Sequence, residues 1–182
     1  MGLIFISYIC KVKFKKMERE YKIKLKYRMY GLVPYNISPI QQGIQFGHGV
    51  VEYLMNNFNK PETQYWANDD KTFIILNGGT TNNFEESLGT LNKHLITLKE
   101  KGILVSTFSE PDLGNQLTSI NFLVDERVWD TEKFPDFFKT KYWGGYTNED
   151  FKSSKEYVEW VQLLGGETNV WLREFLRQFR LA

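Results

Sequence analysis

The strongest constraint on the fold is the segment of residues 36–59, which joins a helix start signal to a stripe of apolar residues. Ser38 is a favourable N-cap residue, and Pro39 falls at the first helical position, where its missing N–H costs no hydrogen bond. Apolar positions then recur at intervals of three and four residues: Ile40, Ile44, Gly47, Val51 and Leu54. This spacing predicts one long helix that buries the apolar stripe.

A polar stripe follows the same helical spacing in this segment: Gln41, Gln45, His48 and Glu52. At roughly 100° per residue the two stripes lie about a quarter turn apart, so one can be buried while the other faces a groove. Gly43, Gly47 and Gly49 each cost about 1 kcal/mol relative to alanine in a helix interior. We therefore expect the helix backbone to lie close to a neighbour or a ligand. The alternative is a surface helix whose side-chain amides face water and whose glycines pack against the core.

Strand and helix patterns alternate around this helix. Apolar runs predict strands at residues 27–35, 71–77, 103–108 and 118–124. Asn82 and Glu85 form an N-cap pair, and Gly102 can close a helix, so a second helix is expected between them. The run 71–77 is nearly continuous, which is typical of a strand buried on both faces. This order predicts an α/β fold, a four-stranded mixed sheet with helices packed on both faces.

The start of the first helix and the loop 109–117 each follow a predicted strand. Ligands of such sheets bind beyond the carboxyl ends of strands, so the two segments are expected to meet there. A carboxylate such as Asp112 can activate or orient water, and amide side chains can hold a carbonyl or an oxyanion. Two alternatives stay open: Asp112 caps its own turn, and His48 is a structural histidine against the sheet.

The two ends of the chain differ from this central part. Residues 127–182 carry many aromatic and turn residues and two helical patterns, at 153–164 and 167–181, which predict a C-terminal aromatic-rich helical extension docked through a satellite core. Stacking of its aromatic rings on single-stranded nucleic acid is the alternative. The expected organisation is a basic extension at 1–28, an α/β domain at 29–126 and the helical extension at 127–182.

The basic extension carries a concentrated positive charge. Residues 11–28 hold nine Lys and Arg against two Glu, a local charge of +7, whereas the whole chain has a net charge of +1. Such a patch attracts phosphate backbones. Alternating lysines are also typical of an exposed edge strand that is kept soluble by charge.

Composition excludes several kinds of site. The single Cys10 allows no internal disulfide and no cysteine-rich zinc site, so a reducing, cytoplasmic setting is the default expectation. Two histidines cannot build a histidine-rich metal centre, and no apolar run approaches the roughly 18 residues of a membrane span. Phosphate-loop, dinucleotide-binding, nucleophile-elbow and zinc-protease motifs are absent from the sequence. We expect no metal, no cofactor and no membrane association.

Three segments together resemble the type 2 peptidyl-tRNA hydrolase family: GIQFGHGVVEY, FIILNG and SEPDLGNQLTSINF. The resemblance covers about residues 29–126, and its firmest marks are Gln45-x-x-His48-Gly49 and Glu110-Pro111-Asp112-Leu113. The Glu110-Pro111-Asp112-Leu113 motif resembles a divergent bacterial and phage branch of the superfamily more than its archaeal and eukaryotic core. The resemblance implies a mixed sheet between helices, often in a homodimer. It also implies tRNA as partner and metal-independent hydrolysis of the ester that links a peptide to the tRNA 3′ end.

The resemblance also assigns roles to residues. It makes Asp112, His48 and Thr118 the candidate catalytic residues, with Asp112 activating water. The candidate substrate-binding residues are Gln41, Gln45, Asn115 and Gln116.

Two departures from the family pattern affect these roles. Ile40-Gln41 stands where the family carries a Gly-Lys pair, and Asn115 replaces an arginine. The rival hypothesis is therefore a catalytically degenerate binding module of the same fold, which recognises RNA, a nucleotide or a protein partner.

Overall fold

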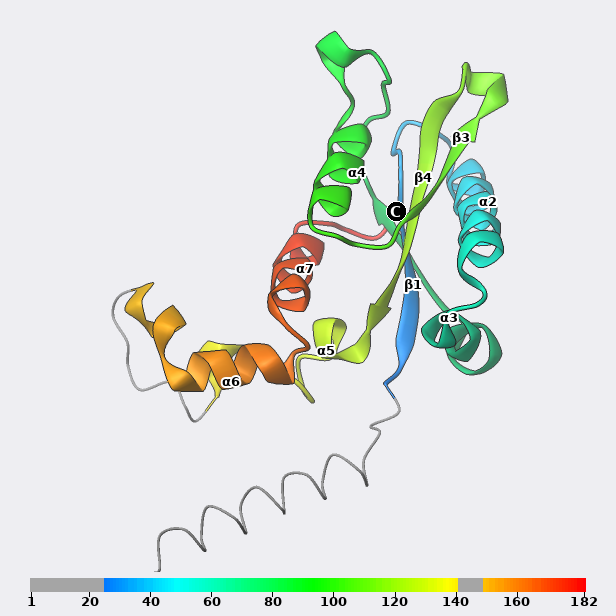
Figure 1. The fold of residues 1–182 in the computed structure, drawn as a ribbon. Helices are drawn as coiled ribbons and strands as arrows, with labels where there is room; N and C mark the ends of the chain where they lie inside the picture. The colour runs from blue at the N-terminus through cyan, green and yellow to red at the C-terminus, as the bar shows by residue number, and fades with distance from the viewer. Residues whose placement is uncertain (1–24, 141–148) are drawn as a thin grey trace, which may run out of the picture.

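The computed structural model describes residues 25–140 and 149–182 (Figure 1). Cys10, most of the basic segment 11–28 and the aromatic residues Tyr142, Trp143 and Tyr146 lie outside the described residues, and so do the expectations that rest on them. The strands are β1 (Tyr27–Val33), β2 (Thr72–Asn77), β3 (Ser106–Glu110) and β4 (Gln116–Asp125). The α-helices are α2 (Pro39–Asn57), α3 (Pro61–Tyr65), α4 (Thr90–Glu100), α5 (Glu126–Trp129), α6 (Lys155–Leu163) and α7 (Glu167–Arg177).

The four strands form one mixed sheet in the order β2-β1-β4-β3. β1 pairs in parallel with β2 and antiparallel with β4, and β3 pairs antiparallel with β4. Helices cover both faces: α2 and α3 lie on one side, and α4 and α7 on the other (Figure 1). Successive residues of β1 alternate between the two cores, with Met29 facing α2 and Tyr30 facing α7. The predicted α/β fold with a helical C-terminal region is confirmed.

Helix α2 begins as predicted but buries a different face. The Ser38 side chain accepts a hydrogen bond from the Gln41 N–H, and the Gln41 side chain accepts one from the Ser38 N–H. The expected apolar stripe, however, is turned to solvent: Ile40 is 78% exposed and Val51 58%. The buried positions are instead Gln42, Gln45, Phe46, Gly49, Val50, Tyr53 and Asn57.

The reason for this orientation is the close approach of α2 to the sheet. A Cβ atom at Gly49 would overlap the side chain of the fully buried Asn121 on β4. That contact lets the aromatic rings of Phe46 and Tyr53 fill the core beneath the helix. The buried amide of Gln42 is satisfied by the Pro34 carbonyl at 3.2 Å. Of the three glycines of the helix, only Gly49 makes the predicted close contact; nothing lies within 4 Å of a Cβ built at Gly43 or Gly47.

The second predicted helix starts later than expected. α4 begins at Thr90 after Gly89, and residues 78–89 form a loop with a single 3-10 turn, Glu85–Ser87. The Asn82 side chain accepts a hydrogen bond from the Phe84 N–H at 3.0 Å and so caps a local turn. Phe84 is 71% exposed and takes no part in the core. The prediction of a helix from Asn82 was wrong. The backbone N–H groups of Asn82 and Asn83 bond instead to side chains of α4 and of β4.

Strand β2 lies at an edge of the sheet, and only Leu76 of its six residues is buried, so the prediction that it is buried on both faces was wrong. Phe73 is 51% exposed, although its ring contacts Phe46 and Trp66. The chain terminus covers part of this edge: the Asn77 N–H donates to the Arg180 carbonyl at 2.9 Å, and the Ala182 N–H donates to the Ile75 carbonyl at 3.0 Å. The segment before β2 folds into α3 and a π-helical turn, Trp66–Asp70, that buries Trp66.

The C-terminal region packs as predicted around a satellite core. Its buried members are Phe134, Phe137, Trp160, Val161 and Leu164. α7 joins this region to the sheet, because Leu172 and Phe175 belong to the main core. In the described parts of the chain, no helix combines the length and apolar character needed to cross a membrane.

Candidate functional site

The centre of the candidate site is the side chain of Gln45 on α2. Its amide nitrogen donates to Glu110 Oε2 at 2.6 Å, and its amide oxygen accepts from Thr118 Oγ1, also at 2.6 Å. Glu110 ends β3 and Thr118 lies near the start of β4, so one amide joins the helix to both sides of the β3–β4 turn. Gln45 is only 7% exposed, and these two partners determine which end of its amide is the donor.

The topology of the sheet explains why these residues meet. β1 and β3 are both antiparallel to β4, so their carboxyl ends lie at the same end of the sheet. α2 starts soon after β1 and runs back along β3 and β4 (Figure 1). The first helix and the 109–117 segment therefore meet at this end of the sheet, through Gln45 in the second turn of α2 and Glu110, the last residue of β3, rather than through the start of the helix.

His48 lies three residues after Gln45 on α2, on the side of the helix that faces β3. The centre of its ring lies 4.5 Å from the centre of the Phe108 ring, edge against face. The side chain remains exposed to solvent, so its imidazole can reach a ligand. His48 thus makes the packing contact with the sheet that the structural alternative expected, and its side chain is also exposed.

Asp112 lies in the 3-10 turn Pro111–Leu113, at the tip of the β3–β4 connection. Its backbone N–H faces Glu110 Oε1 at 3.4 Å, so Glu110 rather than Asp112 caps the turn. Asp112 is exposed, and no described residue forms an ion pair or a hydrogen bond with its carboxylate. Gly114 and Asn115 both have positive φ, 65° and 58°, which turns the chain back into β4.

Three of the predicted site residues bind elsewhere. The Gln41 side chain belongs to the capping box of α2. Asn115 and Gln116 hold the loop before α4: the Asn115 carbonyl accepts from Asn83 Nδ2 at 2.7 Å, and Gln116 Oε1 accepts from the Asn83 N–H at 3.0 Å. The Gln45 cluster therefore includes Thr118 but none of these three residues. It also includes Glu110, to which the sequence assigned no role although the residue opens the Glu-Pro-Asp-Leu motif.

The charge of the site is negative. Glu110 and Asp112 are carboxylates, Glu52 lies one turn beyond His48, and neither α2 nor the 110–118 segment contains a lysine or an arginine. Two described residues of the basic segment, Lys26 and Arg28, lie at the start of β1, at the end of the sheet away from Glu110. Among the described residues no three histidine, cysteine or acidic side chains lie close enough together to hold a metal ion.

Comparison with known proteins gives no relative: no protein-family model, no curated protein and no solved structure matches this chain.

Proposed function

We propose that the surface formed by Gln45, His48, Glu110 and Asp112 binds the 3′ end of a peptidyl-tRNA and hydrolyses its ester bond without a metal ion. The observation that carries the proposal is the Gln45 amide, held between Glu110 and Thr118 at 2.6 Å on each side. It joins the two motifs of the family resemblance into one polar surface.

The reaction follows from the accessible groups. Water attacks the ester carbonyl carbon while the exposed Asp112 carboxylate takes its proton. The bond to the ribose oxygen then breaks, and that oxygen leaves with the proton returned from Asp112. Gln45 uses one amide hydrogen for Glu110, so its second hydrogen is free to donate to the substrate carbonyl, and His48 lies on the same side to position the substrate.

Thr118 and Glu110 have a different role in this scheme. Thr118 is fully buried, and its hydroxyl donates to Gln45. Glu110 accepts from the other end of the same amide. Both residues therefore act through Gln45, and we assign them as positioning residues.

The direct test is hydrolysis of an N-acetylated aminoacyl-tRNA, a model peptidyl-tRNA, by the wild-type chain and by Asp112→Asn. Loss of a general base is expected to lower kcat by roughly 100- to 10,000-fold. Glu159→Gln is the matched control, because it makes the same change of a carboxylate to an amide on the exposed surface of α6. Absence of turnover by the wild type, or equal turnover by wild type and Asp112→Asn, would refute the catalytic role.

One observation favours a second function, non-catalytic binding of a protein partner on the same fold. The outward side of α2 exposes five apolar side chains: Ile40, Ile44, Val51, Met55 and Phe58. The helix carries a single formal charge, Glu52, so this side offers little attraction to phosphate. Titration with tRNA over a salt series separates the functions, since phosphate contacts make the affinity fall steeply as salt rises. Lack of any tRNA affinity would favour the protein-binding function.

A further inference from the structure

The outward side of α2 carries five apolar side chains that face solvent, with Ile44 49% exposed and Met55 80% exposed. At roughly 100° per residue the five positions lie within about 60° of one another, so they form one stripe along the helix. We call it the α2 stripe; its members are Ile40, Ile44, Val51, Met55 and Phe58. It presents on the order of 600 Å² of apolar surface, the upper end of what a monomer usually exposes in one patch.

The α2 stripe lacks the charges with which a surface helix normally meets water. The solvent side of such a helix is usually charged or polar, as on α4, which exposes Lys93 and Glu100. In α2 the single formal charge is Glu52, and it lies at the margin of the stripe together with the exposed Gln41 and His48. An apolar patch with a polar rim is typical of a surface that another protein covers.

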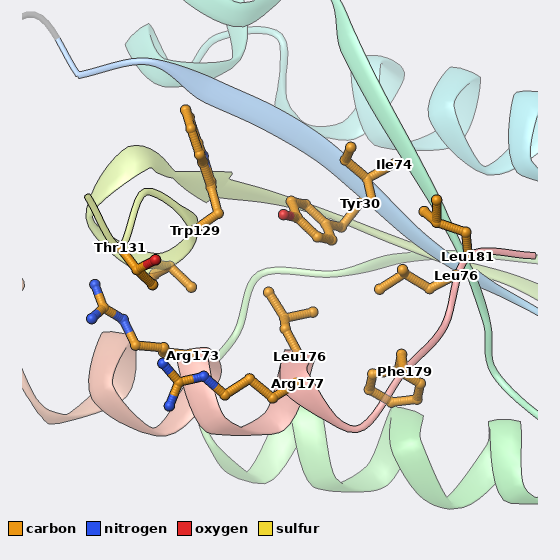
Figure 2. Close-up of a pocket in the computed structure, with 11 residues that line it drawn as sticks. Tyr30, Ile74, Leu76, Trp129, Thr131, Arg173, Leu176, Arg177, Phe179 and Leu181 are labelled. Carbon is orange, nitrogen blue, oxygen red and sulfur yellow. The ribbon is translucent and has the colours of Figure 1, made fainter. Parts of the chain in front are cut away.

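The opposite face of the sheet differs, because the chain itself covers it. Figure 2 shows Leu176 and Phe179, at the end of the chain, beside Tyr30 of β1 and Leu76 of β2, and all four pack in the main core. The hollow that remains there has a volume of about 290 Å³, too small to admit a helix of a partner. The described residues leave the α2 stripe uncovered, as the exposed fractions of its side chains show.

The order of residues in the α2 stripe selects a second copy of this chain as the partner. Closed dimers of identical chains have two-fold symmetry, so the same surface of both copies must match itself. When two α2 helices cross antiparallel about the midpoint of residues 40–55, Ile40 lies opposite Met55 of the other copy. Ile44 likewise lies opposite Val51, since the members of each pair are equidistant from that midpoint. Apolar side chains therefore meet apolar side chains on both sides of the two-fold axis.

Charge favours the antiparallel over the parallel arrangement. In a parallel pair the two Glu52 carboxylates would lie at the same height along the interface and repel each other. In the antiparallel pair Glu52 lies opposite the uncharged Gly43, and the two helix dipoles also run in opposite directions.

We propose that the α2 stripe is the interface of a homodimer in which two copies of α2 pack antiparallel, with Ile44 of each copy against Val51 of the other. This names the partner of the protein-binding function above and rests on that function, whereas hydrolysis at the Gln45 surface does not depend on it. Standard interfaces bury about 800 Å² per partner, which the stripe and its polar rim approach. We therefore expect a dissociation constant of roughly 1–100 µM.

Sedimentation velocity of the full chain, at concentrations of roughly 1–300 µM, measures this constant. Ile44→Lys places a lysine in the interface twice, once from each copy, and is expected to weaken the dimer at least roughly 100-fold. The matched control is Ile96→Lys, the same change at a 46% exposed isoleucine of α4, which is expected to leave the dimer unchanged.

Three results would overturn the proposal: a wild type that stays monomeric, a dimer that Ile44→Lys does not weaken, and equal weakening by Ile96→Lys. A monomeric wild type without tRNA affinity would reject the dimer alone, and would leave a different protein as the partner in the protein-binding function.

A mixture of two variants tests the antiparallel pairing itself. Val51→Glu alone is expected to disrupt the dimer as Ile44→Lys does, and it provides a second variant if the first fails to fold. When the two variants are mixed, one lysine meets one glutamate across the axis, and the other contact keeps its isoleucine and valine. The mixed dimer is therefore expected to be at least roughly 10-fold tighter than the dimer of either variant. Two variants that are folded by circular dichroism and still do not associate in the mixture would show that the helices do not pair in this way.

Discussion

Gly49 of α2 lies so close to Asn121 of β4 that no side chain fits between them. Asn121 is fully buried; its Oδ1 accepts from Ser119 Oγ at 2.5 Å, and its Nδ2 donates to the Phe46 carbonyl at 3.3 Å. This polar contact beneath the helix sets the distance between α2 and the sheet. It therefore also sets the position of Gln45, one turn before Gly49, relative to the β3–β4 turn.

The first prediction concerns two glycines of α2 that differ only in their surroundings. Gly49→Ala is expected to lower the free energy of unfolding by about 1–3 kcal/mol, because its methyl group forces α2 away from the sheet. Gly47→Ala, with nothing within 4 Å of its Cβ, is expected to raise that free energy by about 0.5–1 kcal/mol through helix propensity. Urea unfolding measures both, and equal effects of the two substitutions would contradict the packing argument.

The second prediction concerns the buried hydroxyl of Thr118. Thr118→Val leaves the Gln45 amide oxygen without its donor and is expected to lower the free energy of unfolding by about 1–3 kcal/mol. Under the proposed function it also lowers kcat for peptidyl-tRNA hydrolysis without abolishing it, because Gln45 is no longer held. Thr118→Ser keeps the hydroxyl and is expected to retain most of kcat. Loss of kcat in the serine variant equal to that in the valine variant would show that the hydroxyl does not position Gln45.

The third prediction is a pH dependence of stability that arises from His94 on α4. Burial lowers the pKa of His94 below its ordinary value of 6.5, and its ring packs against Phe175 and Phe179 near α7. The unfolded chain therefore binds a proton at a higher pH than the folded chain does. Stability from this group is present above pH 6.5 and falls as the pH drops below that value.

Urea unfolding at pH 7.5 and pH 5.0 tests this, with His94→Phe as the comparison. The wild type is expected to lose more stability than the variant between these two pH values, because only the wild type has this titrating group. A histidine resonance titration of the wild type gives the pKa directly. A measured pKa at or above 6.5 would contradict the prediction.

The fourth prediction concerns the chain terminus on the edge of β2. Removal of residues 178–182 takes away the two backbone hydrogen bonds that pair this tail with β2 at the Leu76–Leu181 bridge. The expected loss in free energy of unfolding is about 1–3 kcal/mol, and the uncovered edge is expected to promote association of the chains. Thermal unfolding and light scattering measure these effects. As a control, Leu181→Ala keeps the backbone bonds, so it should preserve the monomer-to-aggregate ratio of the full chain.

Local sequence signals correctly predicted the features that depend on neighbouring residues. Ser38 and Pro39 start α2 because capping and proline geometry act within one turn. The strands around Tyr30 and Ile120 follow from apolar runs, and their order along the chain was enough to predict a mixed sheet covered by helices. The meeting of Gln45 with the 110–118 segment followed from the rule that strand ends gather at one end of such a sheet.

Features that depend on contacts between distant residues could not be read in this way. Periodicity could not choose which side of α2 is buried, because Ile40, Ile44 and Val51 give as regular a stripe as Phe46, Val50 and Tyr53 do. The close contact of Gly49 with Asn121 decides between them. Likewise, Asn82 is a residue type that often caps helices, but here its backbone N–H donates to the side-chain oxygen of Asn92 on α4. The backbone N–H of Asn83 donates to the side-chain oxygen of Gln116 on β4. Capping and periodicity are properties of a few adjacent residues, whereas burial and polar partners depend on which surfaces the whole sheet brings together.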